Sequence, residues 1–75
     1  MYLSDMKRMD KALILDFEGL EKDIIKRFFD MGIAIGSQLV LREILNFRRL
    51  FLIRVDEADF CIRHAEAAKI RVELL

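Results

Sequence analysis

The sequence contains no proline and no tryptophan, and only three of its 75 residues are glycine. Disordered and low-complexity chains are rich in proline and glycine and poor in large apolar residues. This sequence is 55% hydrophobic and contains six phenylalanines. A chain this short buries only about 60% of the surface that its unfolded form exposes, so few apolar residues can be spared from the core. We therefore expect residues 1–75 to fold as one small domain.

An excess of charge of one sign is also missing. Thirteen Lys and Arg residues balance thirteen Asp and Glu residues, which gives a formal net charge of zero. Proteins that bind nucleic acid or an anionic membrane through a general electrostatic field carry a clear positive excess. We therefore expect neither nucleic acid nor a membrane surface as partner, and favour another protein.

Long apolar runs and a second cysteine are absent as well. Charges interrupt every stretch before it reaches the roughly 20 apolar residues that cross a bilayer. The segment Met1–Asp10 mixes charged with apolar residues and has no signal-peptide core. Cys61 has no second cysteine with which to form an internal disulfide. These features predict a cytoplasmic domain without direct membrane insertion.

The first half of the chain reads as a strand followed by a helix. Lys11–Phe17 is a short β-rich run that ends at the turn signal Glu18-Gly19. After it, apolar residues recur every three or four positions and predict one buried helix face: Leu20, Ile24, Phe28 and Met31. Gly32 provides the C-terminal cap. We interpret Phe28, Phe29 and Met31 as core or helix-packing residues.

The second half reads mainly as short strands. Strands are predicted at 38–45, at 49–55 and at 58–63, where apolar and polar residues alternate. Asn46, Phe47 and Arg48 would connect the first two, although the periodicity there also allows a helix. Residues 64–69 predict one helical turn and 70–73 a last strand. The fold class is therefore mainly β: a small, closed or nearly closed barrel of about five strands, with one helix after the first strand and a short C-terminal helical turn.

Catalytic and metal-binding motifs are incomplete. Asp56–Asp59 spells the DEAD motif of helicases, but no phosphate-binding glycine loop accompanies it, so we interpret it as a charged turn. Cys61 and His64 lie three residues apart, whereas a zinc site needs three or four ligands. A single histidine also leaves too little to activate Ser4, Ser37 or Cys61 as a nucleophile. We expect no enzyme activity, no cofactor and no metal site.

An apolar surface is predicted around the second hairpin strand. Leu50–Ile53 is apolar at every position. If Phe51 and Ile53 line the barrel, alternation sends Leu50 and Leu52 outward, where Phe47 joins them in a docking surface. Such a patch would also allow a homo-oligomer.

Alternatives to this surface remain open. The N-terminal segment around Tyr2, Leu3 and Met6 could instead cover Leu50 and Leu52 from outside. The adjacent Arg48 and Arg49 could attract a phosphate or an acidic patch on a partner, or form a solvated loop. The candidate interaction residues are Phe47, Arg48, Arg49, Leu50 and Leu52.

Two spaced motifs resemble those of one protein family. Arg27-Phe28-Phe29-Asp30-Met31-Gly32-Ile33, with Gly36 three residues later, is similar to the Arg-Leu-x-x-Met-Gly-Leu-x-x-Gly signature of the FeoA family. Ile62–Glu73 is similar to that family's Leu-Arg-x-x-Glu-Ala-x-x-Ile-x-Val ending, and Leu3-Ser4-Asp5 suits its opening. The resemblance covers essentially the whole chain.

The resemblance implies an SH3-like barrel that serves bacterial ferrous iron transport. It implies a non-enzymatic accessory protein that docks on the cytosolic GTPase region of a FeoB-like membrane transporter and modulates it. The alternative is a stand-alone regulatory module that binds a metal-dependent transcriptional repressor. The family often has Pro-Gly before its first strand and Gly or Pro in the central hairpin, where this chain has Arg8-Met9 and Asn46–Leu50.

Overall fold

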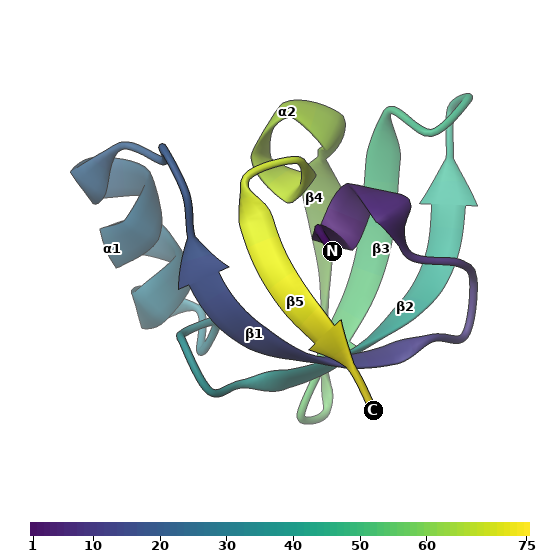
Figure 1. The fold of residues 1–75 in the computed structure, drawn as a ribbon, viewed down its shortest axis with the longest axis horizontal. Helices are drawn as coiled ribbons and strands as arrows, with labels where there is room; N and C mark the ends of the chain where they lie inside the picture. The colour runs from purple at the N-terminus through teal and green to yellow at the C-terminus, as the bar shows by residue number, and fades with distance from the viewer.

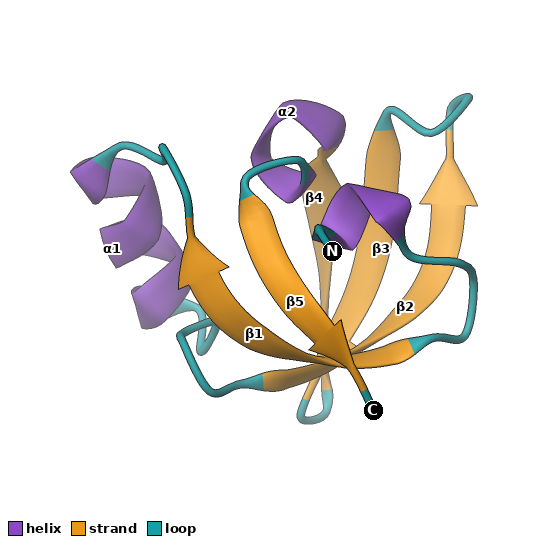
Figure 2. Cartoon of the chain, in the orientation of Figure 1, coloured by secondary structure: helices purple, strands orange, loops and turns teal.

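The computed structural model describes residues 1–75, which form five strands and three short helical segments (Figures 1 and 2). In chain order these are η1 (Leu3–Asp5), β1 (Lys11–Phe17), α1 (Lys22–Asp30), β2 (Gln38–Leu45), β3 (Leu50–Val55), β4 (Ala58–Arg63), α2 (His64–Ala67) and β5 (Ile70–Leu74). All neighbouring strands pair antiparallel, in the order β4-β3-β2-β1-β5. The mainly β, SH3-like fold class is thus confirmed.

The sheet curls into a barrel because its strands bend at irregularities in their pairing. The register shifts between Ile14 and Asp16 on β1, and between Leu41 and Glu43 on β2. Such bulges bend a strand and increase its twist. In Figure 1, β1 and β5 consequently lie in front of β2, β3 and β4.

Strand alternation fills the barrel with apolar side chains. On β3, Phe51, Ile53 and Val55 point inward and are at most 4% exposed, while Leu50 and Leu52 alternate with them. Every buried residue of the chain is apolar, and no buried side-chain polar atom lacks a partner. The barrel is thus a dry core with no polar site inside it.

The first FeoA-like motif ends α1 with a Schellman cap. Gly32 has a φ of 90°, its amide donates to the carbonyl oxygen of Phe29, and the amide of Ile33 donates to that of Phe28 at 2.8 Å. Phe28 and Ile33 are both buried in the core, which supplies the apolar contact that accompanies this cap. The Met-Gly-Ile sequence therefore turns the chain from α1 back towards β1.

The second glycine of that motif forms the next turn. The amide of Ser37 donates to the carbonyl oxygen of Ala34 at 2.9 Å, with Gly36 at a φ of 92°. A positive φ at the third residue of such a turn is the type II pattern that favours glycine. The Ser37 Oγ accepts the amide of Ala34 and reinforces the turn.

The N-terminal segment is part of the barrel. Leu3 and Met6 are fully buried, so the segment contributes to the core. The amide of Val72 donates to the carbonyl oxygen of Met1, and η1 packs against β5 and α2. The Tyr2 hydroxyl donates to the Glu18 carboxylate, a hydrogen bond that raises the pKa of the phenol.

The predicted elements are confirmed with small shifts at their ends. The helix spans Lys22–Asp30, shorter than predicted, and the third strand begins at Leu50 and not at Arg49. Residues 46–49 form the turn of a β-hairpin, so the alternative of a helix there is wrong. The turn of helix at η1 was not predicted, because three residues are too few to show a period.

The turn before β1 places a bulky residue where glycine fits better. The amide of Asp10 donates to the carbonyl oxygen of Lys7 at 3.0 Å, and Met9 has a φ of 73° between them. A type II turn favours Pro-Gly at its two central positions, which Arg8 and Met9 occupy here. Met9 is 59% exposed, so its side chain gains little that offsets the strain.

Replacing Met9 by glycine should therefore stabilise the protein. Met9→Gly removes the left-handed strain and keeps the hydrogen bond that the amide of residue 9 donates to the Leu41 carbonyl oxygen. The free energy of unfolding should therefore rise by about 0.5–1 kcal/mol. Urea denaturation followed by far-UV circular dichroism measures the change. Lys7→Gly is the matched control: Lys7 is exposed without a positive φ, and stability should fall. A loss of stability in Met9→Gly would contradict the account.

Candidate protein-interaction surface

The β2–β3 loop makes one left-handed turn. Asn46, Phe47 and Arg48 have φ angles of 54°, 55° and 65°. The amide of Arg49 closes the turn by donating to the carbonyl oxygens of Leu45 and Asn46, both at 3.2 Å. This conformation costs about 1–2 kcal/mol for an ordinary residue, although asparagine tolerates it better. The loop therefore holds backbone strain at Phe47 and Arg48.

Phe47 lies in the middle of this turn and is 97% exposed. No other large hydrophobic residue of the chain is exposed to that degree. Its ring gains almost no burial in the fold, so burial of the ring cannot offset the strain of its backbone. The stabilisation of this loop must come from its neighbours.

Arg48 supplies that stabilisation by reaching back to the N-terminal segment. Its Nη2 donates hydrogen bonds to the backbone carbonyl oxygens of Ser4, at 2.9 Å, and Met6, at 3.3 Å. Its guanidinium also lies over the Phe51 ring, 5.6 Å from the ring centre. Arg48 thus connects the strained turn to the residues that bring Leu3 and Met6 into the core.

Leu50 and Leu52 lie on the outer face of β3 and are half-buried. Leu50 pairs with Leu45 of β2, which is 42% exposed, and Leu52 pairs with Cys61 of β4. Side chains directly opposite each other on antiparallel strands lie about 4.5–5.5 Å apart at Cβ. These residues form a short, partly exposed strip that leads to the Phe47 turn.

Arg49 differs from Arg48 in the contacts that its side chain makes. Its backbone carbonyl oxygen accepts the amide of His64 at 2.8 Å, which connects the hairpin to α2. Its side chain is in none of the ion pairs or side-chain hydrogen bonds of the structure. Of the two adjacent arginines, Arg49 is the one whose charge is available to a partner.

The DEAD-like stretch forms a hairpin turn. Val55 and Ala58 pair across a two-residue turn made by Asp56 and Glu57. Asp59 lies on β4 and accepts two hydrogen bonds from the Arg54 guanidinium, at 2.8 and 3.2 Å. These bonds hold the pKa of the Asp59 carboxyl below its usual value.

Cys61 and His64 lie on different elements, β4 and α2. Cys61 is exposed on β4, opposite Leu52. His64 begins α2, as predicted, and its ring lies 6.0 Å from the Phe51 ring centre. No group of three His, Cys, Asp or Glu side chains is close enough to hold a metal ion, and no helix is long and apolar enough to span a bilayer.

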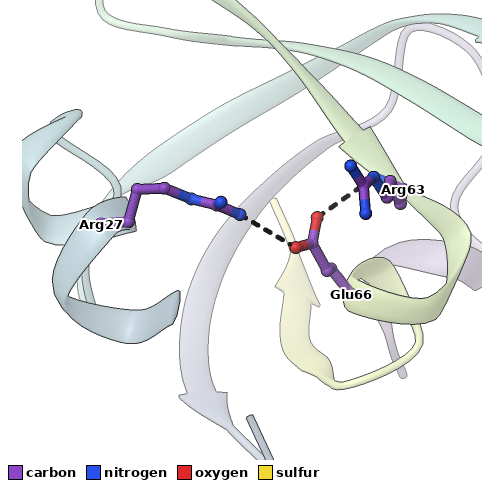
Figure 3. A network of polar contacts seen from close by, with 3 residues as sticks. All are labelled: Arg27, Arg63 and Glu66. Carbon is purple, nitrogen blue, oxygen red and sulfur yellow. Dashed lines mark hydrogen bonds and ion pairs between the residues drawn. The ribbon is translucent and has the colours of Figure 1, made fainter. Parts of the chain in front are cut away.

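The two motifs noted in the sequence meet in space. The Arg27 Nη2 of α1 and the Glu66 Oε2 of α2 form an ion pair at 3.1 Å across 39 residues of sequence (Figure 3). The Oε1 of Glu66 accepts the backbone amide of Arg63 at the start of α2. The Glu66 side chain is 14% exposed and the Arg27 side chain 61%, so only the carboxylate of the pair is shielded from solvent. Next to it, Ala67 is fully buried.

Sequence reasoning missed the exposure of one helix residue. Phe28 is buried and Met31 is half-buried, as predicted, but Phe29 is 69% exposed, so its assignment to the core was wrong. Adjacent helix positions differ by 100° around the axis, so Phe29 lies beside the stripe of Ile24 and Phe28. Applying that spacing strictly to the helix would have predicted that Phe29 is exposed.

Replacing Arg48 tests its role in the fold. Arg48→Lys keeps the charge but removes the Nη2 group that reaches two carbonyl oxygens and the planar guanidinium that lies over the Phe51 ring, so stability should fall by about 1 kcal/mol. Arg49→Lys, one residue away, should change it by less than about 0.5 kcal/mol. Urea denaturation measures both. Equal effects of the two substitutions would show that the Ser4 and Met6 contacts do not stabilise the loop.

Comparison with protein families identifies the chain. Residues 1–74 match the model of the FeoA domain. No curated protein shows significant sequence similarity to it. Among solved structures, the FeoA protein of Chlorobium tepidum is 24% identical, with a TM-score of 0.92 over 100% of this chain and 70% of that one.

Other solved structures share the fold at lower identity. The zinc-complexed FeoA of Stenotrophomonas maltophilia, described as an SH3-domain protein, is 22% identical, with a TM-score of 0.79 over 97% of this chain and 89% of that one. A manganese-dependent transcriptional repressor is 18% identical, with a TM-score of 0.90 over 100% of this chain and 36% of the repressor. From the family match over residues 1–74, the chain belongs to the FeoA family, whose members are non-enzymatic accessory proteins of iron transport.

Proposed function

We propose that this protein acts in the cytoplasm by docking the β2–β3 hairpin on the cytosolic GTPase region of a FeoB-like ferrous iron transporter. Membership of the FeoA family supplies the iron-transport context. The observation that supports the docking surface is Phe47, which is 97% exposed on a strained turn. Backbone strain of this kind is a recognised starting point for a functional hypothesis.

The proposed surface has the composition of an interaction site. Phe47 is the aromatic anchor, Leu50 and Leu52 extend the apolar area, and Arg49 contributes a charge without an internal partner. Aromatic and arginine side chains carry a large share of the binding energy in protein interfaces. Arg48 contributes by holding the turn in place. The matching surface on the transporter is an apolar pocket bordered by acidic residues.

Docking modulates the transporter through a difference in affinity. A bound protein shifts a conformational equilibrium only if it binds one state more tightly than the other. The guanine nucleotide is what changes the state of a GTPase region. The affinity for the chain should therefore depend on whether GTP or GDP is bound.

Phe47→Gly separates docking from folding. Glycine relieves the left-handed strain, so the free energy of unfolding should rise by about 0.5–1 kcal/mol. Loss of the aromatic anchor should weaken binding to the purified cytosolic domain at least about tenfold. Calorimetric titration with GTP analogue, with GDP and without nucleotide measures the affinity, and urea denaturation measures the stability.

Glu57→Ala is the matched control, because Glu57 is exposed in the other hairpin turn and should leave affinity unchanged. Absence of binding in every nucleotide state would overturn the proposal. That result would favour the alternative function, a stand-alone regulatory module that binds a metal-dependent repressor. The fold shared with the manganese-dependent repressor is compatible with that alternative.

A further inference from the structure

The two edges of the five-stranded sheet differ in how the rest of the chain covers them. At the β5 edge, the N-terminal segment lies alongside the strand: the amide of Val72 donates to the carbonyl oxygen of Met1 at 2.8 Å, and Tyr2 forms a bridge with Arg71 (Figure 1). The other edge is β4, and no strand pairs with its outer side. An open edge of this kind is available for pairing with another strand.

The backbone groups of Asp59 and Cys61 point towards this open side. The amide of His64 donates to the carbonyl oxygen of Arg49, which makes these two residues a hydrogen-bonded pair. Because hydrogen-bonded and non-hydrogen-bonded pairs alternate along antiparallel strands, the pairs that β3 forms with Asp59, Cys61 and Arg63 are of the second kind. The amides and carbonyl oxygens of Asp59 and Cys61 therefore lie on the outer side of β4, without a partner in the chain.

The strand carries little that would keep another strand away. Edge strands are commonly protected by lysine or proline, by a bulge, or by being very short. β4 has six residues, contains neither lysine nor proline, and pairs with β3 in an unbroken register. Its outward-facing residues Asp59, Cys61 and Arg63 are all exposed. A second strand can therefore approach along the whole of β4.

The charges on this face are arranged symmetrically about Cys61. Asp59 lies two residues before Cys61 and Arg63 lies two residues after it, so the three share one face of β4. If two copies of β4 pair antiparallel with Cys61 opposite Cys61, each Asp59 lies opposite the Arg63 of the other copy. A parallel pairing in the same register would place like charges side by side. The pattern favours a second copy of the chain, related by a two-fold axis, as the occupant of the edge.

Both charged side chains are available for such a contact. The Arg63 side chain is in none of the ion pairs or side-chain hydrogen bonds of the structure. The Asp59 carboxylate accepts two hydrogen bonds from the Arg54 guanidinium, but its side chain is still 41% exposed. An ionised carboxylate has about four acceptor positions, so about two remain for the arginine of a second copy.

We propose that the chain forms a weak, two-fold symmetric dimer by antiparallel pairing of β4 with β4 of a second copy. At the centre, the Cys61 amide of each copy donates to the Cys61 carbonyl oxygen of the other, and ion pairs between Asp59 and Arg63 lie on either side. The Cys61 thiol takes no part. The pairing uses none of the five candidate interaction residues of the β2–β3 hairpin, so it stands independently of docking on the transporter.

The dependence of the ¹⁵N NMR spectrum on concentration tests this dimer, with the full chain kept reduced. Between about 0.05 and about 2 mM, where weak interfaces associate, the amides of 59–63 should shift. Sedimentation should show dimers and no larger species, because each copy has one open edge. Cys61→Ser keeps the backbone groups and should dimerise as the unmodified chain does. Cys61→Pro removes the outward amide at an edge position that tolerates proline, and should abolish the dimer.

Charge variants test the register of the pairing. Arg63→Asp and Asp59→Arg each place like charges opposite each other in the dimer and should weaken it about tenfold. A mixture of the two variants restores opposite charges at both positions. Unlabelled Asp59→Arg should therefore shift the amides of 59–63 in labelled Arg63→Asp at a concentration where neither variant associates alone. Arg71→Asp is the matched control, because it makes the same change of charge on the covered edge strand β5 and should leave the dimer unchanged.

Three results would overturn the proposal. The first is a spectrum that does not depend on concentration, or that changes mainly at Phe47 or Phe29 and not at 59–63. The second is a failure of the two folded charge variants to associate when mixed. The third is a shift of 59–63 only when the cytosolic domain of the transporter is added, which would make the open edge a binding site for the transporter and not for a second copy.

Discussion

The Arg48 guanidinium, bonded to the backbone carbonyl oxygens of Ser4 and Met6, connects two parts of the fold that depend on each other. The N-terminal segment supplies Leu3 and Met6 to a core that a 75-residue chain can barely fill. The β2–β3 turn needs a contact that offsets its left-handed backbone. One side chain meets both needs, so the strained turn is held in place without any contribution from the Phe47 ring.

The residues of the family signature stabilise the fold, whereas the residues of the proposed docking surface lie in an exposed loop. Gly32 and Gly36 form turns, Arg27 and Glu66 join the two helices, and Ala67 fits into the core. These residues determine the fold and explain why the two motifs can be recognised together. The loops in which the chain departs from the family pattern are instead those that hold bulky residues in left-handed conformations.

Alternation and spacing were enough to predict the five strands, the helix and the outward direction of Leu50 and Leu52, because each of these elements buries one face against a single core. The η1 helix was missed because three residues are too few to show a period, and the burial of Leu3 could not be predicted because it depends on closure of the barrel by distant strands. The left-handed turn at 46–48 could not be foreseen without glycine as a signal.

The central claim is that the fold holds Phe47 outward for a partner. The most direct measurement is a ¹⁵N NMR titration of the chain with the unlabelled cytosolic domain of the FeoB-like transporter, which reports the contact surface residue by residue. The account predicts that the amides of 46–52 change most, with smaller changes at Ser4 and Met6 through the Arg48 contacts. Changes centred on the Asp56-Glu57 turn, with residues 46–52 unaffected, would contradict it.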